Sequence, residues 1–165
     1  MSSESHALAR EIRQTRPFQS LAHEAVLSLI RTAAVVQHWF GEQLAASGLT
    51  PTQYNILRIL RGAGEGGLPT LAIRDRLLDL SPGITRLLDR LVADGLVARR
   101  RGADRRQVVC QITPAGKRLL ARLDAPVHAG HQATMARLTA AQQRTLIQHL
   151  EVIRDAVTAT AGQAS

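Results

Sequence analysis

The chain has 165 residues, of which 45% are hydrophobic and 21% charged, so we expect a folded domain with or without helical extensions and not a disordered chain. Basic residues outnumber acidic ones by 21 to 13, which gives a formal charge of +8, and the single cysteine excludes an internal disulfide. No signal peptide or membrane span is expected, which indicates a cytoplasmic protein, and the charge indicates an anionic partner.

The first half of the chain is predicted to be helical. Apolar residues recur at helical spacing and predict a long amphipathic helix over 17–48. A second helix is predicted over 50–61, because Thr50 and Gln53 have the spacing of a capping box and Pro51 suits the first helical position.

Two shorter helices and a hairpin are predicted next. After a glycine-rich break, a short helix is expected over 69–77. Ser81 and Pro82 then give a second cap-and-proline signal, for a helix that ends at Gly95. Apolar and polar residues alternate on either side of a polar tip over 96–112, which predicts a two-stranded hairpin.

The last part of the chain is predicted to contain two more helices. Thr113 and Pro114 indicate where the fifth helix begins, and Pro126 should kink it or end it early. Thr139 and Gln142 have capping-box spacing for the last helix. The predicted fold class is therefore mainly α with a small β hairpin.

Two short helices followed at once by a basic hairpin form a winged helix-turn-helix. In that arrangement the second, recognition helix enters the major groove, and the hairpin, or wing, lies along the backbone or a minor groove. The candidate DNA-binding residues of the recognition helix are Ser81, Gly83, Thr85, Arg86 and Arg90. Those of the wing are Arg99, Arg101, Asp104, Arg105 and Arg106. Small residues permit close approach, and Thr85 and Arg86 can donate hydrogen bonds to bases or phosphates.

The positive charge is concentrated in the same part of the chain. Between Arg58 and Arg118 there are 13 basic and six acidic residues, so this part carries +7 of the total +8. A run of charge is usually only a solvated face. Here, however, five arginines lie between positions 99 and 106, where mutual repulsion is best tolerated if an anion binds. Double-stranded DNA is the predicted partner.

The segments LTPTQYNILRIL and SPGITRLLDRLVADGLVARRRGADRRQVVCQITPAG resemble the MarR family of bacterial transcription regulators, and the resemblance covers about 21–157. Its most specific part is the wing, where GLV, a basic strand, Asp104-x-Arg106 and a strand followed by Thr113 and Gly116 occur in the order and spacing of the family. The resemblance implies that Arg106 reaches into a minor groove and that Asp104 orients the tip.

The resemblance also implies an obligate homodimer formed by the first, fifth and sixth helices. The implied organisation is a tail over 1–16, dimerisation helices over 17–48 and 114–160, and a winged helix-turn-helix lobe over 50–112. The tail is longer than in many members, and it is either disordered or embraces the partner in the dimer. Independently, the first and last helices carry more apolar surface than a small lobe can cover, which predicts a dimer.

A ligand pocket between the dimer helices and the lobe is implied as well. Trp39, Phe40 and Tyr54 are its candidate lining residues, although the first two could equally belong to the dimer core. Peroxide-sensing members carry a reactive cysteine in the first helix, where this chain has none. Cys110 alternates with apolar residues and is predicted to fill a small apolar site beneath the wing, with a redox role as the alternative.

Two further patterns have structural explanations. The glycines over 62–67 match a dinucleotide-binding GxGxxG, but a helix is predicted before them where that motif needs a strand, so a loop is expected. His128 and His131 have the spacing of one helical face and, with His38 or Glu24, are candidate metal ligands. Scattered surface histidines are the preferred interpretation.

Three functions are compatible with the sequence. The first is a homodimeric transcription regulator, in most family members a repressor, that binds a pseudo-palindromic operator and is released by an unknown small-molecule effector. The second is a constitutive, weakly specific architectural DNA-binding protein, and the third is a metal-responsive sensor of the same fold. No cofactor is predicted. An enzyme is not expected either, because the sequence contains no Ser-His-Asp elbow, HExxH or P-loop motif.

Overall fold

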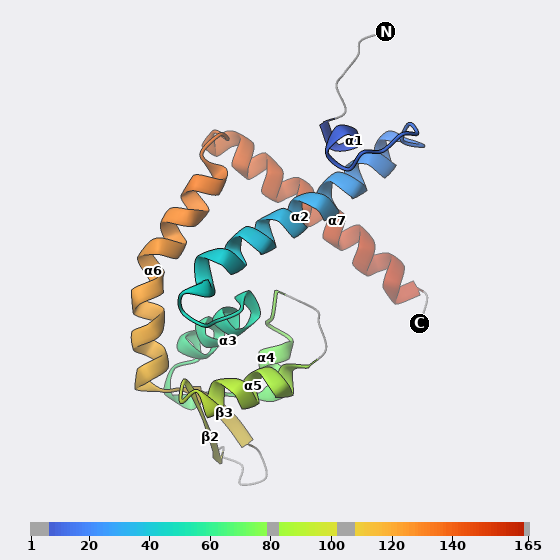
Figure 1. Ribbon diagram of the computed structural model, residues 1–165. Helices are drawn as coiled ribbons and strands as arrows, with labels where there is room; N and C mark the ends of the chain where they lie inside the picture. The colour runs from blue at the N-terminus through green and yellow to red at the C-terminus, as the bar shows by residue number, and fades with distance from the viewer. Residues whose placement is uncertain (1–6, 79–82, 102–107, 164–165) are drawn as a thin grey trace. The chain divides into compact units, whose positions relative to one another are not determined.

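The computed structural model describes residues 7–78, 83–101 and 108–163. The elements in chain order are α1 (Ala7–Glu11), α2 (Leu21–Ala45), α3 (Pro51–Gly62), the 3-10 turn η1 (Gly64–Gly66), β1 (Leu68–Pro69), α4 (Thr70–Arg74), α5 (Ile84–Ala93), β2 (Val97–Arg101), β3 (Val108–Ile112), α6 (Pro114–Met135) and α7 (Ala140–Gln163) (Figure 1). The fold is mainly helical with one small antiparallel sheet, which confirms the predicted class. Two compact units are present, Met1–Leu120 and Ala121–Ser165.

The N-terminal part contains a short helix that the sequence analysis did not predict. Helix α1 buries Leu8 and is joined to α2 by an ion pair between Glu11 and Arg31, whose Oε1 and Nε lie 2.7 Å apart. Helix α2 begins at Leu21 and not near Pro17, because Ser20 caps it and accepts a hydrogen bond from a backbone N–H three residues on. Five residues are too few to form a stable helix alone, so α1 depends on these contacts with α2.

The two predicted capping boxes are confirmed. At the start of α3 the Gln53 N–H donates to the Thr50 hydroxyl at 3.2 Å, and the Thr50 N–H donates to the Gln53 side chain at 3.0 Å. At the start of α7, Thr139 and Gln142 make the same reciprocal pair at 2.8 and 3.3 Å. Each box satisfies two of the N–H groups that a helix start leaves without partners.

The predicted start of the recognition helix at Ser81 and Pro82 is wrong. Helix α5 begins at Ile84, and Gly83 occupies its N-cap position with φ 112° and no side-chain cap. That φ is in the left-handed region, which breaks the helical path before Ile84 and favours glycine. Ser81 and Pro82 themselves lie outside the described residues.

The predicted hairpin is part of a three-stranded antiparallel sheet with the order β1-β3-β2. Strands β2 and β3 pair from Val97–Ile112 to Arg101–Val108, as predicted, and β1 adds Leu68 opposite Cys110. Strand β1 was missed because it has only two residues and one of them is proline, which an edge strand tolerates. A Cβ on Gly67 would lie 2.5 Å from the carbonyl oxygen of Cys110, so the approach of β1 to β3 requires glycine there.

The glycines that resemble a dinucleotide motif have structural roles instead. They follow α3, a helix, and lead through η1 into β1, as the predicted loop requires. The strand that a dinucleotide fingerprint needs before its first glycine is therefore replaced by a helix.

The core of the lobe is aliphatic. Its fully buried side chains come from α3, α4, α5 and the sheet: Ile56, Leu57, Leu60, Ile73, Leu88, Leu91 and Cys110. The predicted buried position of Cys110 is confirmed. The Thr113 hydroxyl donates to the Gly95 carbonyl at 2.7 Å and accepts from the Gly116 N–H at 3.1 Å, which explains the Thr-x-x-Gly motif as a link between the turn after α5 and the start of α6.

Helix α6 does not end at Pro126 but continues to Met135, so the prediction of an early end is wrong. A proline inside a helix removes one backbone hydrogen bond and kinks or breaks many helices, but in α6 the turns on either side of Pro126 continue the helix. Across the described ranges, none of the helices combines the length and apolar character that crossing a bilayer requires.

Candidate nucleic-acid interface

Helix α5 has one buried face and one exposed polar face. Leu88 and Leu91 are completely buried against the rest of the lobe, while Thr85, Arg86 and Asp89 are exposed. Short helix α4 precedes α5, and β2 follows it after a tight turn (Figure 1). Helix α5 is therefore positioned with its polar face outward and its first turn accessible.

The first turn of α5 brings together three of the five residues predicted for the recognition helix. Gly83, Thr85 and Arg86 are all exposed there. The N-terminus of a helix presents free N–H groups and the positive end of the helix dipole, which favour an anion such as a phosphate. Ser81 was predicted to join them and lies outside the described residues.

Arg90 lies on the same helix but is paired with an acidic residue. Its Nε is 3.1 Å from the Asp94 carboxylate in an i,i+4 ion pair. The guanidinium charge is therefore partly compensated within α5. Arg90 contributes less positive field than Arg86, whose side chain is exposed at the helix start.

The alternation of β2 divides its three arginines between the two faces of the sheet. Arg99 and Arg101 follow the buried Val97 on one face, and Arg100 lies on the other. The Arg99 Nη2 lies 2.6 Å from the Asp89 Oδ1 of α5. The hydrogen bond to that carboxylate, and secondarily its charge, raise the pKa of Arg99 above its ordinary value. Among the wing residues predicted to contact DNA, Arg101 is exposed, whereas Asp104, Arg105 and Arg106 lie outside the described residues.

Arg100 was not among the predicted site residues, and the structure places it in a basic cavity. The cavity has a volume of about 390 Å³ and is lined by Glu65, Ala98, Arg100, Gln111, Ile112, Thr113, Pro114 and Lys117. The Gln111 side chain donates to the Glu65 carbonyl at 2.7 Å at its rim. Successive side chains of a strand point to opposite faces, so the sequence alone could have predicted that Arg100 faces away from Arg99 and Arg101.

The aromatic residues proposed for a ligand pocket are only partly brought together. The rings of Phe40 and Tyr54 meet edge to face with centroids 5.6 Å apart, and the Arg58 guanidinium lies 5.9 Å from the centroid of Tyr54. Tyr54 is buried, whereas Phe40 and Trp39 are half-buried. These contacts link the end of α2 to α3.

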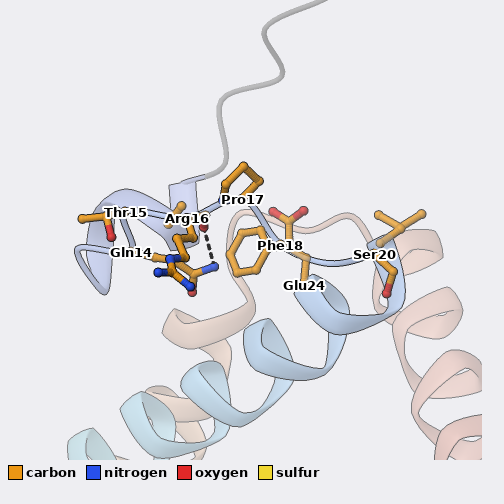
Figure 2. Close-up of a pocket in the computed structure, with 9 residues that line it drawn as sticks. Gln14, Thr15, Arg16, Pro17, Phe18, Ser20 and Glu24 are labelled. Carbon is orange, nitrogen blue, oxygen red and sulfur yellow. Dashed lines mark hydrogen bonds between the residues drawn. The ribbon is translucent and has the colours of Figure 1, made fainter.

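A second cavity, which the sequence did not predict, lies between α1 and the start of α2 (Figure 2). It has a volume of about 510 Å³ and is lined by Ala9, Gln14, Thr15, Arg16, Pro17, Phe18, Ser20, Leu21 and Glu24. The Gln14 amide donates to the Arg16 carbonyl at 2.9 Å, and the Phe18 ring contacts His23 edge to face. Phe18 is thereby held by contacts within this segment.

In the described part of the chain, no three His, Cys, Asp or Glu side chains lie close enough together to bind a metal ion. Of the candidate ligands, His38 lies 3.4 Å from Glu42, its i,i+4 neighbour on α2. His128 and His131 are both exposed on α6, and Glu24 lines the cavity beside α1. These placements give no support to a metal centre.

An exposed polar helix after a short helix, followed by a basic two-stranded wing, defines the class of winged helix-turn-helix DNA-binding proteins. A MarR family model matches residues 47–107, which span α3 to the wing. The solved structure of a MarR transcription factor from Planctomyces limnophilus is 40% identical, has a TM-score of 0.62, and the match covers 82% of this chain and 99% of that chain. The chain belongs to the MarR family of transcription regulators.

Two more distant structures share the fold. The S. aureus MepR–DNA complex has a TM-score of 0.73 at 17% identity, over 84% of this chain and 99% of that chain. CouR from Rhodococcus jostii RHA1 bound to p-coumaroyl-CoA has a TM-score of 0.67 at 23% identity, over 82% and 94% of the two chains. A comparison with curated proteins gave no significant match. Family membership makes this chain a DNA-binding transcription regulator.

Proposed function

We propose that the protein is a repressor that binds a pseudo-palindromic operator as a homodimer and is released by a small-molecule effector. The observation that carries this proposal is the exposed first turn of α5, with Thr85 and Arg86 facing solvent beside the arginines of the wing. A threonine hydroxyl and a guanidinium are both suited to the donor and acceptor groups of the major groove.

In this proposal the residues of the lobe have two roles. Ser81, Gly83, Thr85, Arg86 and Arg90 form the reading surface, which discriminates between base pairs. Arg101, Arg105 and Arg106 form a wing contact with the phosphate backbone and a minor groove, and Asp104 orients the wing tip. The S. aureus relative of the same fold was crystallised with DNA, which supports this mode of action.

Dimerisation is supported by apolar side chains that a single chain leaves exposed. On α2, Leu21 is 82% exposed and Ile30 is 60% exposed; on α7, Val157 is 65% exposed. Such side chains at helical spacing favour burial against a partner. We assign 17–48 and 114–160 to dimerisation, 50–112 to DNA binding, and 1–16 to a tail that is either disordered or embraces the partner.

Effector binding is supported by the aromatic contact between Phe40 and Tyr54 beside the half-buried Trp39. A ligand that contacted these rings would act on the junction of α2 with α3, and α3 packs in the core of the lobe. CouR, a protein of the same fold, binds an acyl-coenzyme A, so the fold accommodates organic ligands.

The experiment that tests this function is footprinting on the DNA that flanks the gene, with random duplex as competitor. We expect protection of two related half-sites whose centres are roughly 34–36 Å apart, the distance between successive major grooves on one face of the duplex. A single unrepeated half-site would contradict the dimeric arrangement. Equal affinity for flanking and random DNA would instead favour the architectural alternative, and loss of binding with a chelator would favour the metal sensor.

A further inference from the structure

The only interaction between charged side chains that joins α5 to the sheet, among the described residues, is the pair Asp89–Arg99. Asp89 lies in the middle of α5, on the exposed side of the helix, and Arg99 is the central residue of β2. The Arg99 Nη2 and the Asp89 Oδ1 are 2.6 Å apart, a distance typical of a charge-assisted hydrogen bond. The pair therefore connects the reading helix directly to the base of the wing.

The turn between α5 and β2 is fixed by contacts close to Val97. Leu91 and Val97 are buried, and the Leu96 N–H donates to the Leu91 carbonyl at 2.9 Å, which fixes the turn between α5 and β2. Beyond Val97 the side chains of β2 become exposed, and its pairing with β3 orients it relative to the sheet but not relative to the outward face of α5. Arg99 connects β2 directly to the outward face of α5 through Asp89.

A chemically similar pair on the same helix cannot do this. Arg90 and Asp94 also join a guanidinium to a carboxylate, at 3.1 Å, but both residues belong to the C-terminal end of α5 and are separated by one helical turn. Their interaction stays close to the helix and makes no contact with the sheet.

We propose that Asp89 and Arg99 are positioning residues for DNA recognition: they fix the wing relative to the reading face of α5, and Arg99 compensates the Asp89 carboxylate on the helix that faces DNA. This inference rests on the proposed function of α5 and the wing. It changes the role of Arg99 from the predicted DNA contact to a residue that acts through α5.

The sign of each effect follows from electrostatics. Replacing Arg99 leaves the Asp89 carboxylate, whose side chain is 54% exposed, uncompensated near the phosphate backbone. Replacing Asp89 removes the group that holds the wing to α5 and leaves the Arg99 guanidinium without its acidic partner. Both changes disturb the geometry that sequence discrimination needs, whereas only a direct phosphate contact by Arg99 would alter the number of counterions released.

The test uses full-length Asp89→Asn, Arg99→Gln, Arg99→Lys and the double variant Asp89→Asn/Arg99→Gln. Operator and random-duplex affinities are measured for each protein at several salt concentrations. We expect each neutral single variant to lower the operator-to-random ratio by about two- to five-fold per subunit, in line with the coupling measured for exposed ion pairs. The double variant should lose no more than either single variant, and Arg99→Lys should recover part of the ratio.

Asp75→Asn is the control and should leave the operator-to-random ratio unchanged, because it breaks the exposed pair of Arg74 Nη2 with Asp75 Oδ1, 3.2 Å apart, which lies outside α5 and the wing. Thermal unfolding of every variant checks that the fold is retained, as expected for side chains outside the core. The inference is overturned if Arg99→Gln weakens operator and random DNA equally and lowers the magnitude of the salt slope by about 0.9 per subunit, since Arg99 would then contact a phosphate directly.

The proposed function can fail separately from this inference. If wild-type protein prefers the operator and both neutral variants keep the full preference, only the positioning role is contradicted. If wild-type protein itself shows no preference for the operator, the proposed function is wrong and the inference is overturned with it.

Discussion

The winged lobe and the long helices use apolar side chains in opposite ways. In the lobe, α3, α5 and the sheet contribute buried aliphatic side chains such as Leu60, Leu88 and Leu91, and the exposed face of α5 is polar and charged. Helices α2 and α7 each leave several large apolar side chains exposed, among them Leu21, Ile30, Val152 and Val157. Apolar residues at helical spacing therefore form a buried core in the lobe. On α2 and α7, in our proposal, they form a surface that a second subunit buries.

Disruption of the proposed interface should have the largest effect. Val157→Asp would place an uncompensated charge in a dimer interface, where burying such a charge costs about 3–5 kcal/mol, and each subunit would carry it. We expect wild-type protein to sediment as a dimer at micromolar concentration and the variant as a monomer. Gln148→Asp adds the same charge elsewhere on α7 and serves as the control. If Val157→Asp sedimented as a dimer like wild type, this face of α7 would not be part of the dimer interface.

Truncation in the closed core should have the next largest effect. Leu60→Ala removes a fully buried side chain of α3 and should lower the free energy of unfolding by about 2–5 kcal/mol. Leu78→Ala is the same chemical change at a side chain that is 87% exposed, and it should change stability by no more than about 0.5 kcal/mol. Denaturant titration of both variants measures the difference. Equal losses would show that the lobe is not a self-sufficient core.

The polar face of α5 should affect DNA binding and not assembly. Thr85→Ala should cost on the order of 1–3 kcal/mol on the operator alone and relax the preference at one base pair in each half-site. Affinity is measured on the operator, on single-base variants of it and on random duplex. Thr134→Ala, an exposed threonine of α6, is the matched control. If Thr85→Ala weakened all DNA equally, α5 would not read base edges through this residue.

The wing should produce the smallest and least selective effect. Arg106→Ala should weaken operator and random duplex similarly and lower the magnitude of the log K against log salt slope by about 0.9 per subunit. Arg137→Ala, which removes an arginine outside the lobe, should leave both quantities unchanged. Unaltered random-DNA binding and an unaltered slope in Arg106→Ala would contradict an electrostatic role for the wing.

Features that depend on neighbouring residues were predictable from the sequence. The capping boxes of Thr50 with Gln53 and of Thr139 with Gln142 form between residues three apart, so the pattern and the hydrogen bonds coincide. The hairpin was predictable for a similar reason, because alternation over each strand determines which side chains share a face. The aliphatic pattern and the glycine positions also placed Cys110 in the core and a loop after α3.

The sequence by itself thus determined the fold class, the order of the main helices and the position of the basic wing. Tertiary structure decided the rest. Helix α1 needs α2 for its ion pair, and β1 needs β3 as its neighbour. In the sequence, Arg99 is one of five arginines between positions 99 and 106. Only the packing of α5 beside β2 brings its side chain to Asp89. These features depend on partners outside the segment concerned, and the free energy of such contacts is not encoded in any local pattern.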